Sequence, residues 1–220
     1  MPRLAIDAAL KQKCPRVALG VVSGQVRVAE NSAALLDEMR RCESAILNLP
    51  EPRSVLESAT ILATRSAYKA LGKDPARYRG SAEALLRRIL SGKQFPQINT
   101  VVDIVNLVSV ETRLPIGLYD LAHVKGDITF RAGRAGESYK GIGKYDLNLE
   151  DLPVFSDAEG PHGSPTSDSE RTMVTLATTQ VAAVLVSFGG AERLHCSCER
   201  TVALFAQHAN GQNPQIEIVS

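Results

Sequence analysis

Apolar residues recur at helical spacing in the first third of the chain, next to residues that commonly begin or end helices. Segment 31–49 has Ser32, a typical N-cap residue, ahead of its apolar positions. Segment 54–72 repeats the apolar spacing and ends at Gly72, a residue type that often follows a helix. The pattern predicts two amphipathic helices packed against a sheet. The apolar positions of the first are Leu35, Leu36, Met39, Cys42, Ile46 and Leu49.

A third amphipathic helix is predicted over 80–92. Ser81 stands where a cap is needed, and Gly92 follows the last apolar residue. Glu83 and Arg87 are four residues apart, a spacing that allows an ion pair, and we expect both on the solvent side of the helix. Its apolar face consists of Ala82, Leu85, Leu86, Ile89 and Leu90.

Strand patterns flank these helices. Valines alternate over 16–28 around Ser23-Gly24, which predicts two short strands joined by a turn. A further strand is predicted over 127–132, and more within 172–188, before a closing helix over 191–210.

Segment 99–112 is apolar on nearly every side of a helix, so we expect a buried helix there. Asn99, Asp103 and Asn106 form one polar stripe along it. A buried carboxylate or amide needs hydrogen-bond partners, because an unpaired one costs about 1–3 kcal/mol. The stripe therefore either ties down neighbouring backbone or lines a ligand pocket, and both roles are compatible.

Composition is typical of a globular protein. The chain has 220 residues, of which 44% are hydrophobic and 22% charged, and we expect a single domain with an N-terminal βα portion (1–75) and a core (76–220). No apolar segment approaches the roughly 20 residues needed to cross a bilayer, and the first residues lack a signal-peptide core. We expect a cytoplasmic protein.

The cysteines favour reduced thiols over disulfides or a metal site. Two of the four lie in "HCSC", where Cys196 and Cys198 would point about 200° apart on a helix. Structural zinc prefers C-x-x-C spacing, so neither a metal nor another cofactor is expected.

A basic region extends from Lys69 to Lys93. Its charges are either a solvated face or a surface for phosphate contact. The formal net charge of +1 provides no general attraction to nucleic acid, so any such binding must be local. The basic residues are Lys69, Lys73, Arg77, Arg79, Arg87, Arg88 and Lys93, against Asp74 and Glu83.

Segment 160–172, "GPHGSPTSDSERT", combines glycines, prolines and polar residues just before an apolar run. It is either a solvated loop or a loop that presents donors and acceptors to a ligand. A Ser/His/Asp triad of Ser164, His162 and Asp168 is disfavoured, because there is no G-x-S-x-G elbow and triad members usually come from distant segments.

The segment 99–137 carries a specific resemblance. It is similar to the run N-x-V-V-D-x-x-N, then P-x-H-x-F-D, then G-x-I-x-V-R-x-A-x-x-G-E of the editing module of the bacterial phenylalanyl-tRNA synthetase β-subunit, which is also called its tRNA-binding domain. The likeness is close over about 40 residues and weaker from near Arg79 to Phe188. The positions in step are Asn99, Val101, Val102, Asp103, Asn106, Pro115, Tyr119, Asp120, Gly126, Ile128, Arg131, Ala132, Gly136 and Glu137. Gly117 stands where that family has His.

The resemblance implies an α+β fold, a layered sandwich of β-sheet and helices, here as a free-standing module. It implies tRNA or aminoacyl-tRNA as the partner, and hydrolysis in trans of the ester between tRNA and a wrongly attached amino acid. The chain is too short to contain a synthetase catalytic core as well. The alternative is a binding module for an amino acid, a nucleoside or a tRNA end, without catalysis.

Candidate site residues follow from the resemblance and from the needs of ester hydrolysis, which are a positioned water and donors for the developing oxyanion. Catalytic candidates are Asn106, Asp168 and Glu170. Substrate-binding candidates are Asp103, Gly117, Arg131, Gly163, Ser164, Thr166 and Arg171. Candidates for contact with RNA phosphates are Arg79, Arg87, Arg88 and Lys93.

Overall fold

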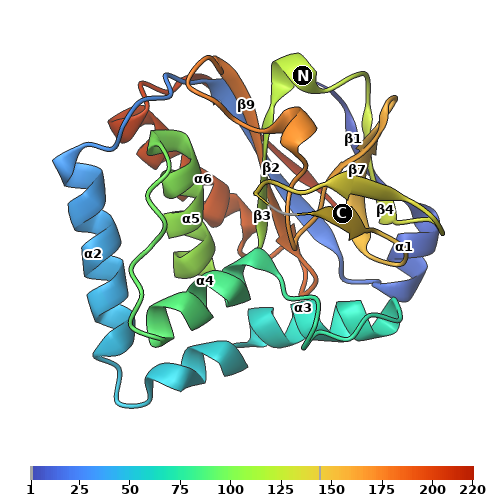
Figure 1. The fold of residues 1–220 in the computed structure, drawn as a ribbon, viewed down its shortest axis with the longest axis horizontal. Helices are drawn as coiled ribbons and strands as arrows, with labels where there is room; N and C mark the ends of the chain where they lie inside the picture. Colours follow the sequence, from blue (N-terminus) through green and yellow to red (C-terminus); the bar gives the residue numbers. More distant parts are fainter. Residues whose placement is uncertain (1, 144) are drawn as a thin grey trace.

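The computed structural model describes residues 2–143 and 145–220 and has an α+β fold (Figure 1). The helices are α1 (Ala8–Lys13), α2 (Ala33–Leu47), α3 (Ala59–Ala70), α4 (Ser81–Leu90), α5 (Thr100–Thr112) and α6 (Leu194–His208), with 3₁₀ turns η1 (Pro52–Glu57), η2 (Leu121–His123) and η3 (Glu170–Thr172). The strands are β1 (Leu4–Ile6), β2 (Ala18–Gln25), β3 (Ile116–Asp120), β4 (Ile128–Ala132), β5 (Ser138–Lys140), β6 (Asp146–Asn148), β7 (Pro153–Asp157), β8 (Gly160–Gly163), β9 (Gln180–Ser187) and β10 (Gln212–Val219). In the described part of the chain no helix is long and apolar enough to span a membrane.

Two four-stranded sheets build the molecule. One is antiparallel with the order β10-β2-β9-β3, and the other has the order β1-β4-β7-β8, in which only β1 and β4 run parallel. Strands β5 and β6 form a separate hairpin. Figure 1 shows α2, α4, α5 and α6 on one side of the first sheet and the second sheet on its other side. Strand β3 lies at the edge of one sheet and β8 at the edge of the other.

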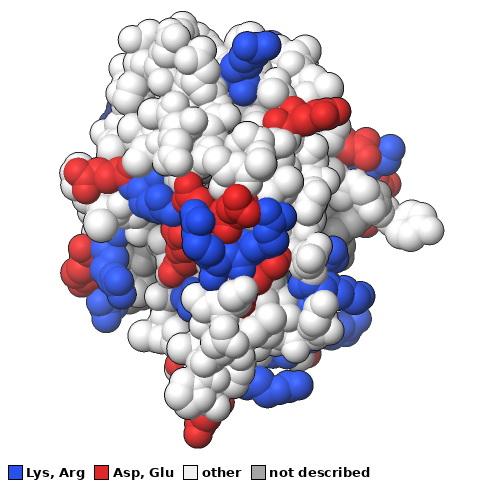
Figure 2. Space-filling model, turned by 90° about the vertical axis from the view of Figure 1, so that its left-hand side faces the viewer, with Lys and Arg blue, Asp and Glu red and all other residues white. Residues whose placement is uncertain are grey.

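The outer side of the helical layer is polar and mixed in charge. Figure 2 shows the side of the molecule that carries α2, where basic and acidic side chains gather in one group. Arg200 of α6 pairs with Glu38 of α2 at 3.1 Å and with Glu111 of α5 at 3.0 Å. His208 lies 2.9 Å from the same Glu38 carboxylate. These contacts tie the three helices together and leave no uniformly basic face there.

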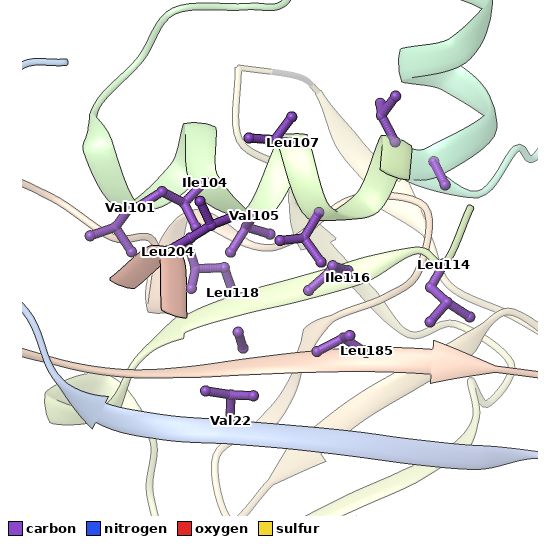
Figure 3. Packing of buried hydrophobic residues seen from close by; sticks show 14 of the residues in the cluster. Val22, Val101, Ile104, Val105, Leu107, Leu114, Ile116, Leu118, Leu185 and Leu204 are labelled. Carbon is purple, nitrogen blue, oxygen red and sulfur yellow. The ribbon is translucent and has the colours of Figure 1, made fainter. Parts of the chain in front are cut away.

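Alternation along the strands separates two apolar cores. On β3, Leu118 packs with the helices, whereas Tyr119 packs between the two sheets. On β9, Leu185 faces the helices and Val184 faces the second sheet, as expected for a strand whose successive side chains point to opposite faces. Figure 3 shows the helical core, in which Val101, Ile104, Val105 and Leu107 of α5 lie with Leu204 of α6 over Val22, Leu114, Ile116, Leu118 and Leu185.

Several predicted helices are confirmed, and α2 is confirmed with its predicted cap. Helix α2 begins after Ser32, whose hydroxyl accepts a hydrogen bond from the Leu35 amide at 3.2 Å. Helix α5 is buried, as predicted, and Asn99 is its N-cap, accepting from the Val102 amide at 3.0 Å. In α6, Cys198 is fully buried and Cys196 is exposed, so the thiols do face different sides.

Other predictions about the helices were wrong at their ends. The helix predicted over 54–72 is split into η1 and α3 at Ser58, whose backbone is not helical. Gly80, not Ser81, is the N-cap of α4. Glu83 is buried rather than on the solvent side, because it accepts hydrogen bonds from Arg65 at 2.8 and 2.9 Å and from Arg87 at 2.7 Å.

The turn predicted at Ser23-Gly24 was also wrong. Both residues lie inside β2, which continues to Gln25 because β9 pairs with it along its whole length and β10 pairs with it on the other side. The strands that lie outside the predicted elements are β1, β3, β5, β6, β7, β8 and β10. They are short, or they contain glycine or proline, as β8 does in "GPHG".

Candidate functional site

The loop after β8 is held in one conformation by its own polar groups. The Ser164 hydroxyl donates to the Ser167 carbonyl at 2.8 Å and accepts from the Ser167 amide at 3.1 Å. Tyr139 of β5 donates to the same carbonyl at 2.5 Å. The Thr166 hydroxyl lies 2.7 Å from that of Tyr68 on α3. Within segment 160–172, which was predicted as a loop throughout, only 164–169 is a loop, because Gly160–Gly163 form β8 and Glu170–Thr172 form η3. This loop after β8 is anchored to α3 and β5.

Asp168 joins this loop to the edge of β3. Its carboxylate accepts from the Leu118 amide at 3.1 Å and from the Tyr119 hydroxyl at 3.1 Å. Its carbonyl accepts from the Ile142 amide at 3.0 Å, at the end of the β5 strand. Three segments that are distant in the sequence, β3, the β5 region and the loop after β8, thus meet at the half-buried residue Asp168.

Tyr119 fills the space between two glycines at this junction. A Cβ placed on Gly117 would lie 2.1 Å from the Tyr119 hydroxyl oxygen, and one placed on Gly163 would lie 2.3 Å from it. The Tyr119 ring is completely buried and packs against Phe155 with centroids 5.7 Å apart. Neither glycine has a positive φ, so the backbone conformation does not require glycine at these positions. Glycine is needed because the Tyr119 ring lies too close to both Cα atoms for a side chain to fit.

His162 lies beside Tyr119 and is completely buried. The two rings meet edge to face, with centroids 4.6 Å apart and an angle of 88° between them. Among the described residues, neither ring nitrogen of His162 has a hydrogen-bond partner. Burial lowers the pKa of His162 to about 4; the charge of Asp157 opposes this shift and that of Arg171 adds to it. The imidazole is therefore neutral at pH 7.

The two arginines among the substrate-binding candidates, Arg131 on β4 and Arg171 on η3, are already paired. Arg131 forms two hydrogen bonds with Glu137, at 2.7 and 2.8 Å, and these bonds lower the pKa of the Glu137 carboxyl. Arg171 binds Asp157 at 2.9 and 3.0 Å and also donates to the Gly160 carbonyl at 3.2 Å. Bidentate pairs of this kind are the stronger ion pairs in proteins. Each guanidinium would have to exchange a carboxylate partner to hold a phosphate.

The polar stripe of α5 lies in the helical layer. Asp103 is completely buried, and its carboxylate accepts from the Asn31 amide group at 2.6 Å and the Ile98 backbone amide at 2.8 Å. Asn106 donates to it at 3.4 Å. Burial raises the pKa of Asp103, against the effect of these donors. The structure thus contains the tie to neighbouring backbone that the sequence allowed, and a ligand role for Asn106 and Asp103 stays a prediction.

The remaining candidates are distributed around the loop and α4. Glu170 pairs with Lys140 of β5 at 3.0 Å. Arg87 pairs with Glu83, and the Arg88 guanidinium donates to the Gln94 carbonyl at 2.6 Å. Arg79 and Lys93 are exposed. Asp168, Gly117, Gly163, Ser164 and Thr166 are brought together; Asn106 and Asp103 lie with Asn31 instead.

Two tyrosines of the site were not singled out from the sequence. Tyr68 and Tyr139 each hold the loop after β8 through a hydroxyl. Tyr68 lies within an amphipathic helix pattern and Tyr139 in a short polar segment, so neither carried a local signal. Only the pairing of distant segments reveals them.

Comparisons with known proteins relate this chain to one domain family. The family model described as the B3/4 domain matches residues 63–202, a longer stretch than the resemblance from near Arg79 to Phe188. The β-subunit of phenylalanine–tRNA ligase from Paramagnetospirillum magneticum is 32% identical over 104 residues, which cover 46% of this chain and 13% of that protein. The corresponding subunit of Chromobacterium violaceum is 31% identical over 100 residues, covering 44% and 13%.

A crystal structure of an N-terminal fragment of the phenylalanyl-tRNA synthetase β-subunit from Pyrococcus horikoshii is also similar, with 18% identity and a TM-score of 0.49 over 99% of this chain and 50% of that one. This chain corresponds to only a small part of the two ligase subunits it matches. The family match, in contrast, covers more than half of its residues and includes β3, the β5–β6 hairpin and the loop after β8. The chain belongs to the B3/4 domain family.

Proposed function

We propose that this chain binds the aminoacylated end of a tRNA at the junction of β3 and the loop after β8. Membership of the B3/4 family supports this proposal. So does similarity to β-subunits of a ligase that is named for tRNA. The two curated relatives share only part of their length with this chain, so the proposal concerns the domain and not ligation.

The observation that carries the proposal is the Asp168 carboxylate bound to β3. Its hydrogen bonds to the Leu118 amide and the Tyr119 hydroxyl hold a loop rich in donors and acceptors against the edge of a sheet. A loop ordered in advance loses less conformational entropy when a ligand binds. Thr166, Ser167 and the nearby backbone are half-buried or buried, so a ligand end that reaches them would meet polar groups in a partly dry site.

Binding is favoured over hydrolysis by the partners of the three catalytic candidates. The hydrogen bond of Asn106 runs to Asp103, the carboxylate of Asp168 contacts β3, and Glu170 pairs with Lys140. Hydrolysis of an ester needs a base and oxyanion donors aimed at one carbonyl. These contacts direct the three candidates to different neighbours and not to one common point. A site that only binds the aminoacyl end does not need its polar groups to meet at one carbonyl.

Hydrolysis in trans is the second candidate, and the state of His162 favours it. This imidazole is neutral at pH 7 and, within residues 2–143 and 145–220, lacks a hydrogen-bond partner on either ring nitrogen. The Tyr119 ring packs against both His162 and Phe155, so His162 would reach a water only if the Tyr119 and Phe155 rings shifted together. It could then take a proton from a water that attacks the ester carbonyl and return it to the departing ribose oxygen. Gly163 and Ser164 would then provide amide donors beside it.

The test incubates the protein with a panel of aminoacylated tRNAs and measures both retention of each tRNA and loss of its amino acid. The binding proposal predicts that one or a few charged tRNAs are retained, with the ester intact. Loss of the amino acid, abolished in His162→Gln or Asp168→Ala while the variants remain folded, would establish the hydrolytic alternative. The proposal is wrong if the folded protein neither retains nor deacylates any tRNA of the panel. Asn106→Ala and Glu170→Ala test the other two candidates in the same assay.

A further inference from the structure

The loop that joins α3 to α4, residues Gly72–Gly80, lies next to the candidate site. The Ser81 amide at its end donates to the Pro165 carbonyl of the site loop at 2.7 Å. Gly80 also packs against Pro115, which precedes β3: a Cβ on Gly80 would lie 3.7 Å from that proline. On the α3 side, Tyr68 holds Thr166 of the site loop. The loop Gly72–Gly80 therefore borders both segments that form the proposed receptor.

The shape of this loop turns its one acidic residue toward its own backbone. The Asp74 carboxylate accepts from the Ala76 amide at 2.9 Å, and its carbonyl accepts from the amides of Arg77 and Tyr78 at 3.0 and 2.9 Å. The result is a single compact turn that begins at Gly72, which has a φ of +90°. A carboxylate engaged in this way is less available to pair with the cations around it.

The cations of this loop differ from Arg131 and Arg171, the two arginines among the substrate-binding candidates. From Lys69 to Gly80 there are four basic residues and one acidic residue. Arg77 and Arg79 are exposed, and neither guanidinium is paired with a carboxylate in the described part of the chain. Lys73 lies over the ring of Tyr78, 5.0 Å from its centroid. Arg131 and Arg171, in contrast, are held by Glu137 and Asp157.

The difference between unpaired and paired arginines indicates where the phosphodiester backbone of an RNA would bind. An exposed, unpaired guanidinium gains a phosphate contact without first giving up a carboxylate, whereas a bidentate pair must be broken. On α4, Arg87 is paired with Glu83, and the Arg88 side chain is bonded to a carbonyl. The loop Gly72–Gly80 combines free cations with direct contact to the site loop.

We infer that the loop Gly72–Gly80, through Lys73, Arg77 and Arg79, binds the phosphodiester backbone of the tRNA whose aminoacyl end enters the site. This inference rests on the proposed function and names a surface for it. The ring of Tyr78, half-buried under Lys73, fixes that cation at the side of the loop. The ligand chemistry is that of RNA phosphates read by charge, so no base sequence is specified.

The experiment measures the affinity of the full chain for a fluorescently labelled tRNA transcript at several salt concentrations. Arg77→Glu/Arg79→Glu is compared with Arg41→Glu/Arg53→Glu, which makes the same change in net charge at two exposed arginines of α2 and η1. We expect the loop variant to bind at least about 10-fold more weakly at about 0.1 M salt. The slope of log affinity against log salt should fall by about 1.4–1.8, because two phosphate contacts are lost. The control should bind like the unmodified protein.

The outcomes separate the two proposals. If the unmodified protein binds tRNA and the loop variant binds equally tightly, or the control loses as much, the inference about the loop is wrong and the proposed function stands. If the unmodified, folded protein binds neither the transcript nor the same tRNA carrying an amide-linked amino acid at any salt concentration, both are wrong. Urea unfolding of each variant checks that folding is intact; because all four arginines are exposed, we expect no large change.

Discussion

At the level of single residues, the centre of the site is one large side chain on β3 that packs against a glycine of β3 and a glycine of β8. Gly117 and Gly163 have no side chains, and the Tyr119 ring lies in the space that they leave. The sequence singled out Gly117 as the position where the related family has His, and Gly163 as a loop glycine. It did not indicate that Tyr119, two residues further along the same face of β3, fills both spaces, because that contact depends on β8 approaching from the other sheet.

Gly117→Ala should therefore destabilise the protein by about 1–3 kcal/mol, the usual cost of an added group in a packed core. The added Cβ would meet the Tyr119 ring, which is fully buried and has no free space to move into without disturbing Phe155. Urea unfolding measures the loss. Gly189→Ala is the matched control, since its nearest neighbour would be a side-chain atom at 3.7 Å. Equal stability of the two variants would contradict the packing described for Tyr119.

His162 predicts a pH dependence at the same scale. Its pKa in the folded protein is about 4, whereas it is about 6.5 in the unfolded chain. Between these values the unfolded state binds the proton and the folded state does not, so stability falls as the pH falls. From pH 7 to pH 5 this one group should cost about 2 kcal/mol.

Urea titrations at the two pH values measure that loss. His162→Gln should lose about 2 kcal/mol less than the unmodified protein over this interval. His195→Gln, which removes an exposed histidine, should behave like the unmodified protein. The account of His162 is contradicted if its removal leaves the pH dependence unchanged.

At the scale of elements, the layers are connected by a few buried charges. Glu83 links α4 to α3 through Arg65, and Asp103 links α5 to the segments before α2 and before α5. The sequence identified Asp103 as a group that needs partners, because the surrounding helix is apolar on nearly every side. It placed Glu83 on the solvent side, since helical spacing alone does not show that α3 covers α4.

Glu83→Gln should reduce stability by about 1–3 kcal/mol, because it removes the charged partner of two arginines. Glu83 is 4% exposed, while Arg65 and Arg87 are 26% and 43% exposed, so water compensates part of the loss. Thermal or urea unfolding provides the measurement. Glu51→Gln, an exposed neutralisation next to η1, should change stability by less than about 0.5 kcal/mol. A result in which the two variants lose equally would show that the Glu83 contacts do not stabilise the packing of α3 on α4.

Elements were predictable where a periodic pattern and an end signal coincided. Helix α2 has both, whereas α5 and α6 were predicted from their apolar patterns without an end signal. Strands such as β8 and β10 contain glycine or proline and lie at sheet edges. Proline is tolerated in an edge strand, and neither strand has the alternating apolar and polar residues that would identify it in the sequence. Their existence depends on partners supplied by distant segments, and no local pattern specifies those partners.

At the scale of the whole molecule, the two sheets bring the loop after β8 to the edge of β3 and set the loop Gly72–Gly80 beside it. The family resemblance carried by segment 99–137 anticipated the B3/4 fold, since its spaced residues lie on α5, β3 and β4. It did not distinguish residues at the junction from residues in the helical layer. Asn106 contacts Asp103 in the helical layer, whereas Asp168 contacts β3. This difference in partners arises only when the layers are assembled.

Recognition of the aminoacyl end can be measured as the affinity of the protein for tRNAs carrying an amide-linked, non-hydrolysable amino acid, compared with its affinity for the same tRNAs uncharged. We predict that at least one charged tRNA binds at least about 10-fold more tightly than its uncharged form, a difference of about 1.4 kcal/mol. Asp168→Ala should remove that difference, and Asp146→Ala, an exposed carboxylate on β6, should preserve it. Equal affinity for charged and uncharged tRNA across the panel, with the protein folded, would contradict recognition of the aminoacyl end.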